Sequence, residues 1–178
     1  ILKEGTVDFV SFSYYMTSCM AASTDGLEMS PGNTVNGVKN PYLTSSEWGW
    51  QTDPIGLRIS LVELYDRFRK PLFIVENGLG AHDTLTEDGK VHDHYRIEYL
   101  KEHVKAMSDA INIDGVDLLG YTWWGCIDLI SESTRQMSKR YGFVYVDLDD
   151  EGHGTYKRYR KDSFYYYKKL IAANGNVD

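Results

Sequence analysis

Glu76 is the residue of this sequence whose position is best suited to chemistry. It lies in the stretch PLFIVENGLGAHD, directly after the apolar run Leu72–Val75 and directly before Asn77-Gly78. A short continuous apolar run is typical of a strand covered on both faces in a parallel sheet, and Asn-Gly permits a sharp turn. In α/β folds, catalytic side chains gather at the carboxyl ends of such strands. Position alone leaves two interpretations open, a catalytic carboxylate or a strand-end residue that caps the next loop.

Two further segments have the pattern of strands, and both end in aromatic residues. Residues 7–15 (VDFVSFSYY) end in two tyrosines, and residues 116–124 (VDLLGYTWW) end in two tryptophans. Because the carboxyl ends of parallel strands meet at one edge of a sheet, we expect these rings to lie near Glu76. The chain is rich in such rings, with fourteen Tyr and four Trp, which suits sugar binding as well as an ordinary core.

Helical patterns separate these strands. Asp53-Pro54 is typical of an N-cap followed by proline in the first turn, and Asp93 is the expected N-cap of the next helix. Apolar spacings of three and four predict helices at about residues 53–69, 94–111 and 161–173. The alternation predicts an α/β fold with a parallel sheet, of the (β/α)8 TIM-barrel type. Because a closed barrel needs ~250 residues, we expect three βα units of an incomplete one.

Composition and charge exclude several classes of protein. The 178 residues suffice for one domain, and the net charge of -7 argues against a nucleic-acid binder. The sequence shows neither a membrane-spanning apolar run nor a signal-peptide pattern at its start. Cys19 and Cys126 are far apart, and the five histidines form no strong ligand pair. We therefore expect no metal, no nucleic acid and no membrane partner.

Five ordered motifs resemble those of glycoside hydrolase family 1. VENG resembles the nucleophile motif of that family, and DFVSFSYY resembles its sixth strand. SEWGWQTDPIGLR, GYTWWGCIDLIS and RYGFVYVD resemble its tryptophan segment, its eighth strand and its closing hairpin. The blocks stand in family order and cover essentially the whole chain. The resemblance implies that residues 1–178 form the C-terminal part of a single TIM-barrel catalytic domain, about its last three βα units. It also implies that the enzyme needs no metal and no organic cofactor.

The segment SESTRQMSKRY, residues 131–141, resembles the phosphate-binding loop of the 6-phospho-β-glucosidase subfamily. Most family members have Glu-Trp here, and that Glu holds sugar hydroxyls. A 6-phosphate carries about -1.5 to -2 charges, so hydroxyl and ammonium donors suit it better. The resemblance implies Lys139, Tyr141 and either Ser131 or Ser133 as phosphate ligands. Glu132, between the two serines, departs from the subfamily pattern.

The same loop concentrates positive charge in an acidic chain. Arg135, Lys139 and Arg140 form a basic cluster that we expect to attract an anionic substrate. The alternative is a solvated basic loop with no ligand. Asp128, just before the loop, is interpreted as a residue that organises it.

The resemblance also implies roles around Glu76. Glu76 becomes the nucleophile of a retaining glycosidase, whose two carboxyl groups lie ~5–5.5 Å apart. Tyr15 matches the family tyrosine that bonds the nucleophile, so Tyr14 is expected to point to the opposite face, into packing. Trp124 is expected to stack under the sugar ring. The long irregular stretch at residues 17–52 contains Trp48 and Trp50, for which sugar contact and core packing both remain open.

The general acid of the family is the Glu of an Asn-Glu-Pro motif, which does not occur in this sequence. The resemblance therefore implies that the N-terminal part of the same enzyme supplies the acid. This chain alone is expected to be nearly inactive, because loss of general acid catalysis removes about 10²–10⁴-fold in rate. Apolar strand edges should pair with that N-terminal part, or with a second copy in a homo-oligomer.

The implied function is hydrolysis of 6-phospho-β-glucosides, such as cellobiose 6-phosphate or aryl glucoside 6-phosphates, to glucose 6-phosphate and an aglycone. Phosphorylated disaccharides arise on import into bacteria, so the implied location is cytoplasmic. Two alternatives remain open. One is a β-glucosidase acting on unphosphorylated sugars, and the other is a non-catalytic module that binds sugar phosphates.

Overall fold

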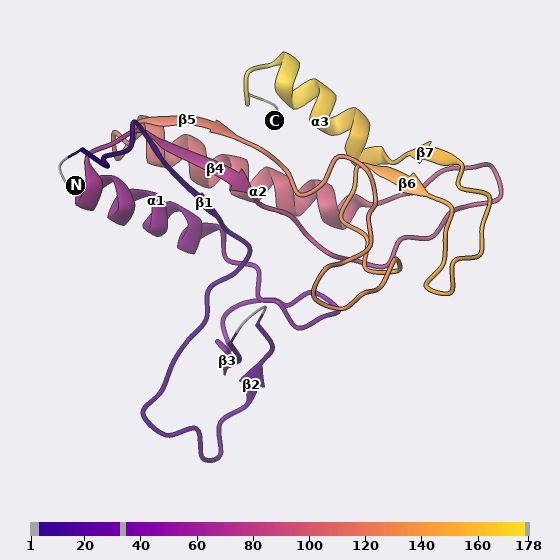
Figure 1. Ribbon diagram of the computed structural model, residues 1–178, viewed down its shortest axis with the longest axis horizontal. Coiled ribbons are helices and arrows are strands. Elements are labelled where there is room, and N and C mark those ends of the chain that lie inside the picture. Colours follow the sequence, from indigo (N-terminus) through magenta and orange to yellow (C-terminus); the bar gives the residue numbers. More distant parts are fainter. Residues whose placement is uncertain (1–3, 33–34, 177–178) are drawn as a thin grey trace.

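The computed structural model of the chain describes residues 4–32 and 35–176 (Figure 1). Its centre is a three-stranded parallel sheet in the order β1-β4-β5, formed by Val10–Ser13, Leu72–Glu76 and Leu118–Tyr121. Helix α1 (Pro54–Phe68) connects the first two strands and α2 (His94–Asn112) connects the second and third. The predicted alternation of strands and helices is therefore confirmed, and the described residues form no closed barrel.

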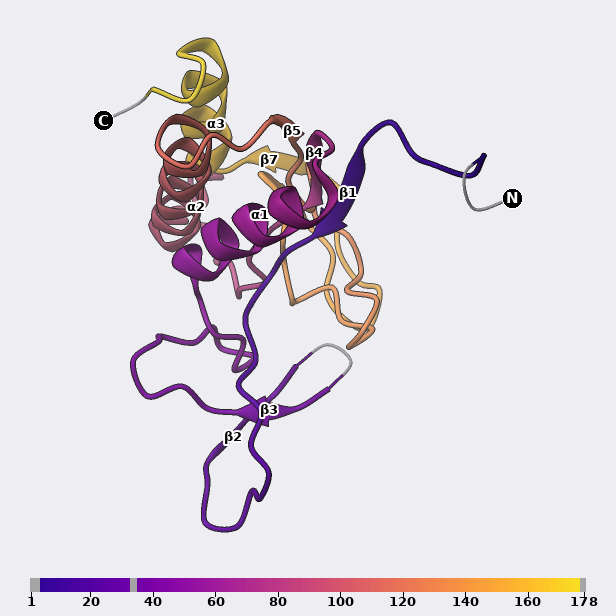
Figure 2. The same cartoon turned by 90° about the vertical axis from the view of Figure 1, so that its left-hand side faces the viewer.

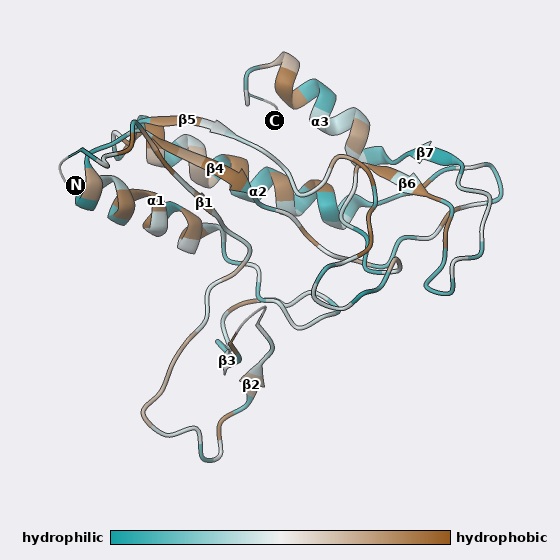
Figure 3. Cartoon of the chain, in the orientation of Figure 1, coloured by the Kyte–Doolittle hydropathy of each residue, from teal (hydrophilic) through white to brown (hydrophobic). Residues whose placement is uncertain are grey.

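Helices α1 and α2 lie side by side against one face of the sheet (Figure 2). Leu57 and Leu61 of α1 are buried against Leu72 and Ile74 of β4. Figure 3 shows the hydrophobic residues of β4 in brown. On the other face, Val75 is 40% exposed. The prediction that this strand is covered on both faces is wrong for these residues, because the chain provides helices for one face only.

The helix boundaries follow local signals with one exception. Asp53 caps α1 as predicted, since its carboxylate accepts from the Gly56 N–H at 2.8 Å. Asp93 occupies the N-cap position of α2, but its side chain does not cap that helix. Its carboxylate instead accepts from the Ser163 N–H at 2.9 Å, in the first turn of α3 (Asp162–Ala172). Asp93 thus joins the starts of two helices that are distant in sequence.

Two short antiparallel pairings complete the fold. The expected closing hairpin is present as β6 (Val144–Val146) paired antiparallel with β7 (Arg158–Arg160). Strands β2 (Met29–Ser30) and β3 (Gly37–Val38) pair within the long loop, which projects away from the sheet and helices (Figure 1). No helix in the described ranges is long and apolar enough to cross a membrane.

Candidate active site

Glu76 is the last residue of β4, and Tyr15 contacts it from the segment that directly follows the neighbouring strand β1. The Tyr15 hydroxyl donates to Glu76 Oε2 at 3.0 Å. Burial, together with the Glu76 charge, raises the pKa of the Tyr15 hydroxyl far above its usual value, so it donates as a neutral phenol. Tyr14 points the other way, as predicted, and its hydroxyl donates to the Asp53 carbonyl at 2.6 Å. Strand alternation therefore sends one tyrosine to the core and the other to the carboxylate.

Asn77 fixes the end of β4 from within the core. Its buried side-chain amide donates to the Tyr14 carbonyl at 2.8 Å and to the Tyr99 hydroxyl at 3.0 Å. Its oxygen accepts from the Tyr121 hydroxyl at 2.9 Å. The Tyr99 hydroxyl in turn donates to the Tyr15 carbonyl at 3.2 Å. The sequence showed Asn77 only as a turn residue, whereas the structure makes it the junction of β1, α2 and β5.

His103 holds Tyr99, one of the residues that bind Asn77, in place. Its ring stacks on Tyr99 at a centroid distance of 3.9 Å, and its Nδ1 donates to the Tyr99 carbonyl at 2.7 Å. Its Nε2 is buried and has no hydrogen-bond partner among the described residues. Burial lowers the pKa of His103 to about 4. The ring is therefore neutral in the folded protein at neutral pH.

We expect His103 to make the fold sensitive to acid. Between pH 6.5 and 4 the unfolded chain binds a proton at this histidine that the folded chain does not bind. The contribution of neutral His103 to the free energy of unfolding is therefore fully present above pH 6.5. It decreases as the pH falls toward 4, by up to about 3 kcal/mol. Thermal unfolding of His103→Phe should show a smaller loss over this range than the wild type. The matched control is His94→Phe, since His94 is exposed; an unchanged slope in H103F would contradict the prediction.

The loop after Glu76 is paired directly with residues 131–141. Ala81 and Arg140 exchange two backbone hydrogen bonds, each of 3.0 Å. At Gly80, an added Cβ would lie 2.9 Å from Lys139 Cε and 3.0 Å from Tyr141 Cζ. Only glycine allows both side chains to pass this close to the backbone. The predicted phosphate-binding loop and the predicted nucleophile are therefore joined through residues 76–81.

Lys139 is 2% exposed and has no carboxylate partner among the described residues. Its Nζ lies 4.2 Å from the ring centroid of Trp50, 5.3 Å from that of Trp48 and 5.8 Å from that of Tyr141. Burial lowers the pKa of Lys139 below its usual value. Ser131 is also buried, and burial raises the pKa of the Tyr141 hydroxyl while the nearby Ser131 hydroxyl opposes that rise. The structure thus brings Lys139, Tyr141 and Ser131 together.

The rest of the predicted basic cluster is not part of this group, so that prediction is wrong. Arg140 is 5% exposed, and its guanidinium bonds Asp128 at 3.1 Å and the backbone carbonyls of Val146 and Leu148. Arg135 is exposed. Arg140 therefore turns to Asp128 and the hairpin backbone, whereas Lys139 turns to the rings of Trp48, Trp50 and Tyr141. Of these three cations, Lys139 is the one that is both buried and without an ion pair among the described residues.

Asp128 organises the loop, as predicted. Its carboxylate accepts from the Gly142 N–H at 2.8 Å, from Arg140, and from Lys161 Nζ at 2.7 Å. Lys161 also pairs with Asp83, which in turn pairs with Arg96. The sequence contained no signal for this buried network, because its partners are up to 78 residues apart.

The remaining predicted residues divide between the core and the surface. Trp123 is buried and donates from its indole to the Tyr141 carbonyl at 2.7 Å, whereas Trp124 is partly exposed. The Trp124 N–H donates to the Asn77 carbonyl at 2.8 Å, which holds this residue beside the end of β4. Ser133 and Glu132 are both exposed. Trp124 is therefore positioned near Glu76, and Ser133 lies outside the buried group around Lys139.

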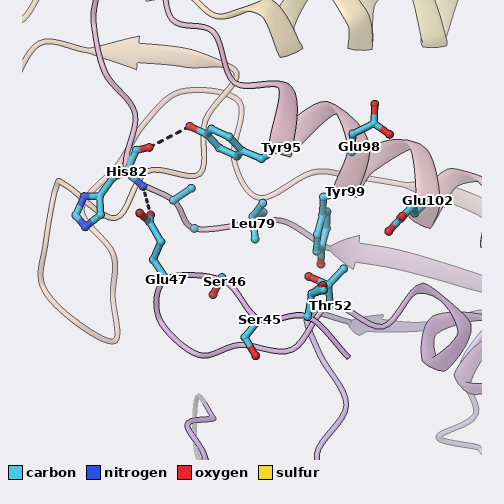
Figure 4. A pocket seen from close by; sticks show the side chains of 13 residues that line it. Ser45, Ser46, Glu47, Thr52, Leu79, His82, Tyr95, Glu98, Tyr99 and Glu102 are labelled. Atoms are coloured by element: carbon cyan, nitrogen blue, oxygen red, sulfur yellow. Dashed lines mark hydrogen bonds between the residues drawn. The ribbon is translucent and has the colours of Figure 1, made fainter. Parts of the chain in front are cut away.

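A cavity of about 510 Å³ lies between α2 and residues 44–52, and Tyr99 forms part of its wall (Figure 4). Glu47, Glu98 and Glu102 line it, and no lysine or arginine does. The His82 N–H donates to Glu47 within its wall at 2.8 Å. This cavity does not include Glu76 or Lys139, and its negative charge is unsuited to a phosphate. In the described residues, no group of His, Cys, Asp and Glu could hold a metal ion.

Comparisons with known proteins agree with this geometry. Residues 1–176 match the sequence profile of glycosyl hydrolase family 1. The aryl-phospho-β-D-glucosidase BglH of Bacillus subtilis (strain 168) is 62% identical over 177 residues, which cover 98% of this chain and 37% of that protein. A 6-phospho-β-glucosidase of Dickeya chrysanthemi is 59% identical over 174 residues, with the same coverage. Among solved structures, a family 1 β-glucosidase from Thermotoga maritima superposes with a TM-score of 0.81 at 33% identity, over 97% of this chain and 36% of that one. The chain thus spans little more than a third of the length of these proteins.

Proposed function

The chain belongs to glycosyl hydrolase family 1, and we propose that it is the C-terminal part of a single (β/α)8-barrel domain that hydrolyses 6-phospho-β-glucosides. The products are glucose 6-phosphate and an aglycone. The observation that carries this proposal is the ammonium of Lys139, which is buried without a carboxylate and joined through Ala81–Arg140 to the loop that follows Glu76. An uncompensated cation at this place suits the phosphate of a sugar whose anomeric carbon reaches Glu76.

In the proposed reaction, a Glu76 carboxylate oxygen attacks the anomeric carbon while a general acid protonates the departing glycosidic oxygen. Water then attacks the glycosyl ester, gives its proton to the conjugate base of that acid, and releases Glu76. The Tyr15 hydroxyl orients the carboxylate through its 3.0 Å hydrogen bond. Trp124 provides the apolar face for the sugar ring. The general acid belongs to the N-terminal part of the enzyme.

The proposed phosphate site consists of Lys139, Tyr141 and Ser131. Ser131 is favoured over Ser133 because it is buried beside Tyr141, whereas Ser133 is exposed. The exposure of Glu132 agrees with this assignment, since a carboxylate among the ligands would repel the phosphate. Sugars phosphorylated at the 6-position form during import into bacteria, so we place the enzyme in the cytoplasm.

Two features support the incomplete barrel. Strands β1 and β5 are the edges of the sheet, and Leu119 of β5 is 57% exposed. Between α3 and the segment that follows β5 lies a cavity of about 430 Å³ lined mainly by apolar side chains, among them Trp123, Phe164 and Ile171. We propose that the N-terminal part of the enzyme pairs with these edges, or that a second copy does when that part is absent.

We expect this chain alone to be nearly inactive. It lacks the proposed acid, and loss of that acid alone costs about 10²–10⁴-fold. The assay uses cellobiose 6-phosphate and 4-nitrophenyl β-glucoside 6-phosphate, with and without the co-expressed N-terminal part. Turnover should appear with both parts, and the same mixture made with Glu76→Gln should show none. Turnover of cellobiose 6-phosphate by this chain alone would overturn the incomplete barrel.

A β-glucosidase acting on neutral sugars is the second candidate, favoured by the likeness to the Thermotoga maritima β-glucosidase. The ratio of kcat/KM for 4-nitrophenyl β-glucoside 6-phosphate to that for 4-nitrophenyl β-glucoside decides between the two. A ratio near one or below it favours the neutral substrate. Binding of glucose 6-phosphate by the complete enzyme, without turnover of either substrate, would favour a non-catalytic module.

A further inference from the structure

The ammonium of Lys139 is held by aromatic rings. Trp48, Trp50 and Tyr141 surround it at centroid distances of 5.3, 4.2 and 5.8 Å, and we call these three residues the aromatic cage. The aliphatic part of Lys139 rests on Gly80, where a Cβ would leave too little room. The side chain is thus fixed along its length without any ion pair among the described residues.

Such a cage solves a specific problem of anion recognition. A buried ammonium is normally stabilised by a carboxylate, as Lys161 is by Asp83 and Asp128. A carboxylate on Lys139 would compete with a phosphate for the same charge. The face of an indole attracts a cation through its quadrupole but cannot neutralise it. The cage therefore orients the ammonium and leaves its charge available.

Trp50 is the member of the cage that contacts both halves of the site. Its ring is the closest to Lys139 Nζ, and its ring also meets that of Tyr15 edge-on at 5.7 Å. Tyr15 donates to Glu76. Trp50 therefore lies between the residue that would hold the phosphate and the residue that orients the carboxylate.

We propose that Trp50 is a positioning residue for phosphate selectivity, which acts by holding the Lys139 ammonium oriented and free of any carboxylate. This inference rests on the proposed function, and it assigns to Trp50 a role that direct sugar contact does not include. A residue that only contacts the sugar affects phosphorylated and neutral ligands alike. A residue that acts through Lys139 affects the phosphorylated ligand alone.

The test is a double-mutant cycle on the complete enzyme, read as the ratio of inhibition constants for glucose and glucose 6-phosphate. Trp50→Leu should lower this ratio roughly 3- to 30-fold, the range expected for loss of a desolvated cation–π contact. Trp50→Phe should restore part of it, because a ring returns. In a Lys139→Gln background, Trp50→Leu should change the ratio less than twofold, since the cation it holds is gone.

A second measurement does not depend on catalysis or on ligand. The complete enzyme is expressed with lysine carrying ¹³C at Cε, and the Lys139 signal is identified by its loss in K139Q. In the wild type this signal should be shifted upfield by the ring currents of the cage, and in W50L the shift should be clearly smaller, because the nearest ring is gone. An unshifted Lys139 signal in the wild type would overturn the cage.

The possible results distinguish the role of Trp50 from the proposed function. Equal losses of glucose and glucose 6-phosphate binding in W50L would overturn the role of Trp50 while the proposed function stands. The same would follow if W50L lowered the ratio equally in the K139Q background. A wild-type ratio near one would overturn the proposed function itself, and with it the role of Trp50 in selectivity.

Discussion

Glu76→Gln should lower kcat of the complete enzyme by at least about 10⁴-fold, because it removes the atom that forms the bond to the anomeric carbon. Glutamine keeps the size of the side chain and can still meet the Tyr15 hydroxyl, so the fold should be retained. Steady-state hydrolysis of 4-nitrophenyl β-glucoside 6-phosphate provides the measurement. The matched control is Tyr15→Phe, which keeps the carboxylate and removes only its 3.0 Å hydrogen bond. Its loss should be far smaller.

A rescue experiment separates a nucleophile from a structural carboxylate. Glu76→Ala leaves space beside the anomeric carbon, where azide can attack and displace 4-nitrophenolate, a leaving group that needs little acid assistance. The product should be the α-glycosyl azide, because one displacement inverts the β configuration. If azide restored activity but the product were the β-glycosyl azide, Glu76 would not be the nucleophile. A near wild-type kcat in E76Q would lead to the same conclusion.

Lys139→Gln should lower kcat/KM for the phosphorylated substrate roughly 10- to 200-fold, the range for loss of a hydrogen bond to a charged group. The neutral substrate carries no phosphate, so its kcat/KM should be almost unchanged. Arg135→Gln is the matched control, since it removes the same charge from the same loop at an exposed position. Equal losses in the two variants would mean that general attraction by the loop, and not a site at Lys139, selects the phosphate.

The pH dependence of this selectivity has a definite sign. Burial lowers the pKa of Lys139, so the ammonium that binds phosphate is lost as pH rises, earlier than from an exposed lysine. The KM for the phosphorylated substrate should therefore increase at alkaline pH in the wild type. In Lys139→Gln this increase should be absent. A wild-type KM that stays flat up to the usual lysine range would contradict the assignment.

Much of the scaffold could be predicted from the sequence because it depends on local patterns. The apolar stripes set the helices to within a few residues, and the Asp53 cap was visible as a dipeptide. Glu76 could be placed at the end of a strand from the apolar run before it. The opposite directions of Tyr14 and Tyr15 follow from the period of two along a strand.

The sequence by itself thus determined the order of the elements, the place of Glu76 and the family resemblance. Tertiary structure alone decided which polar groups pair. In the folded chain Arg140 is buried against Asp128, and the Asp93 carboxylate binds the first turn of α3 and does not cap α2. Lys139 contacts the rings of the aromatic cage. Periodicity and capping act within a few residues of the chain. The pairing of buried charges depends instead on how distant loops meet, and no pattern within one segment encodes that.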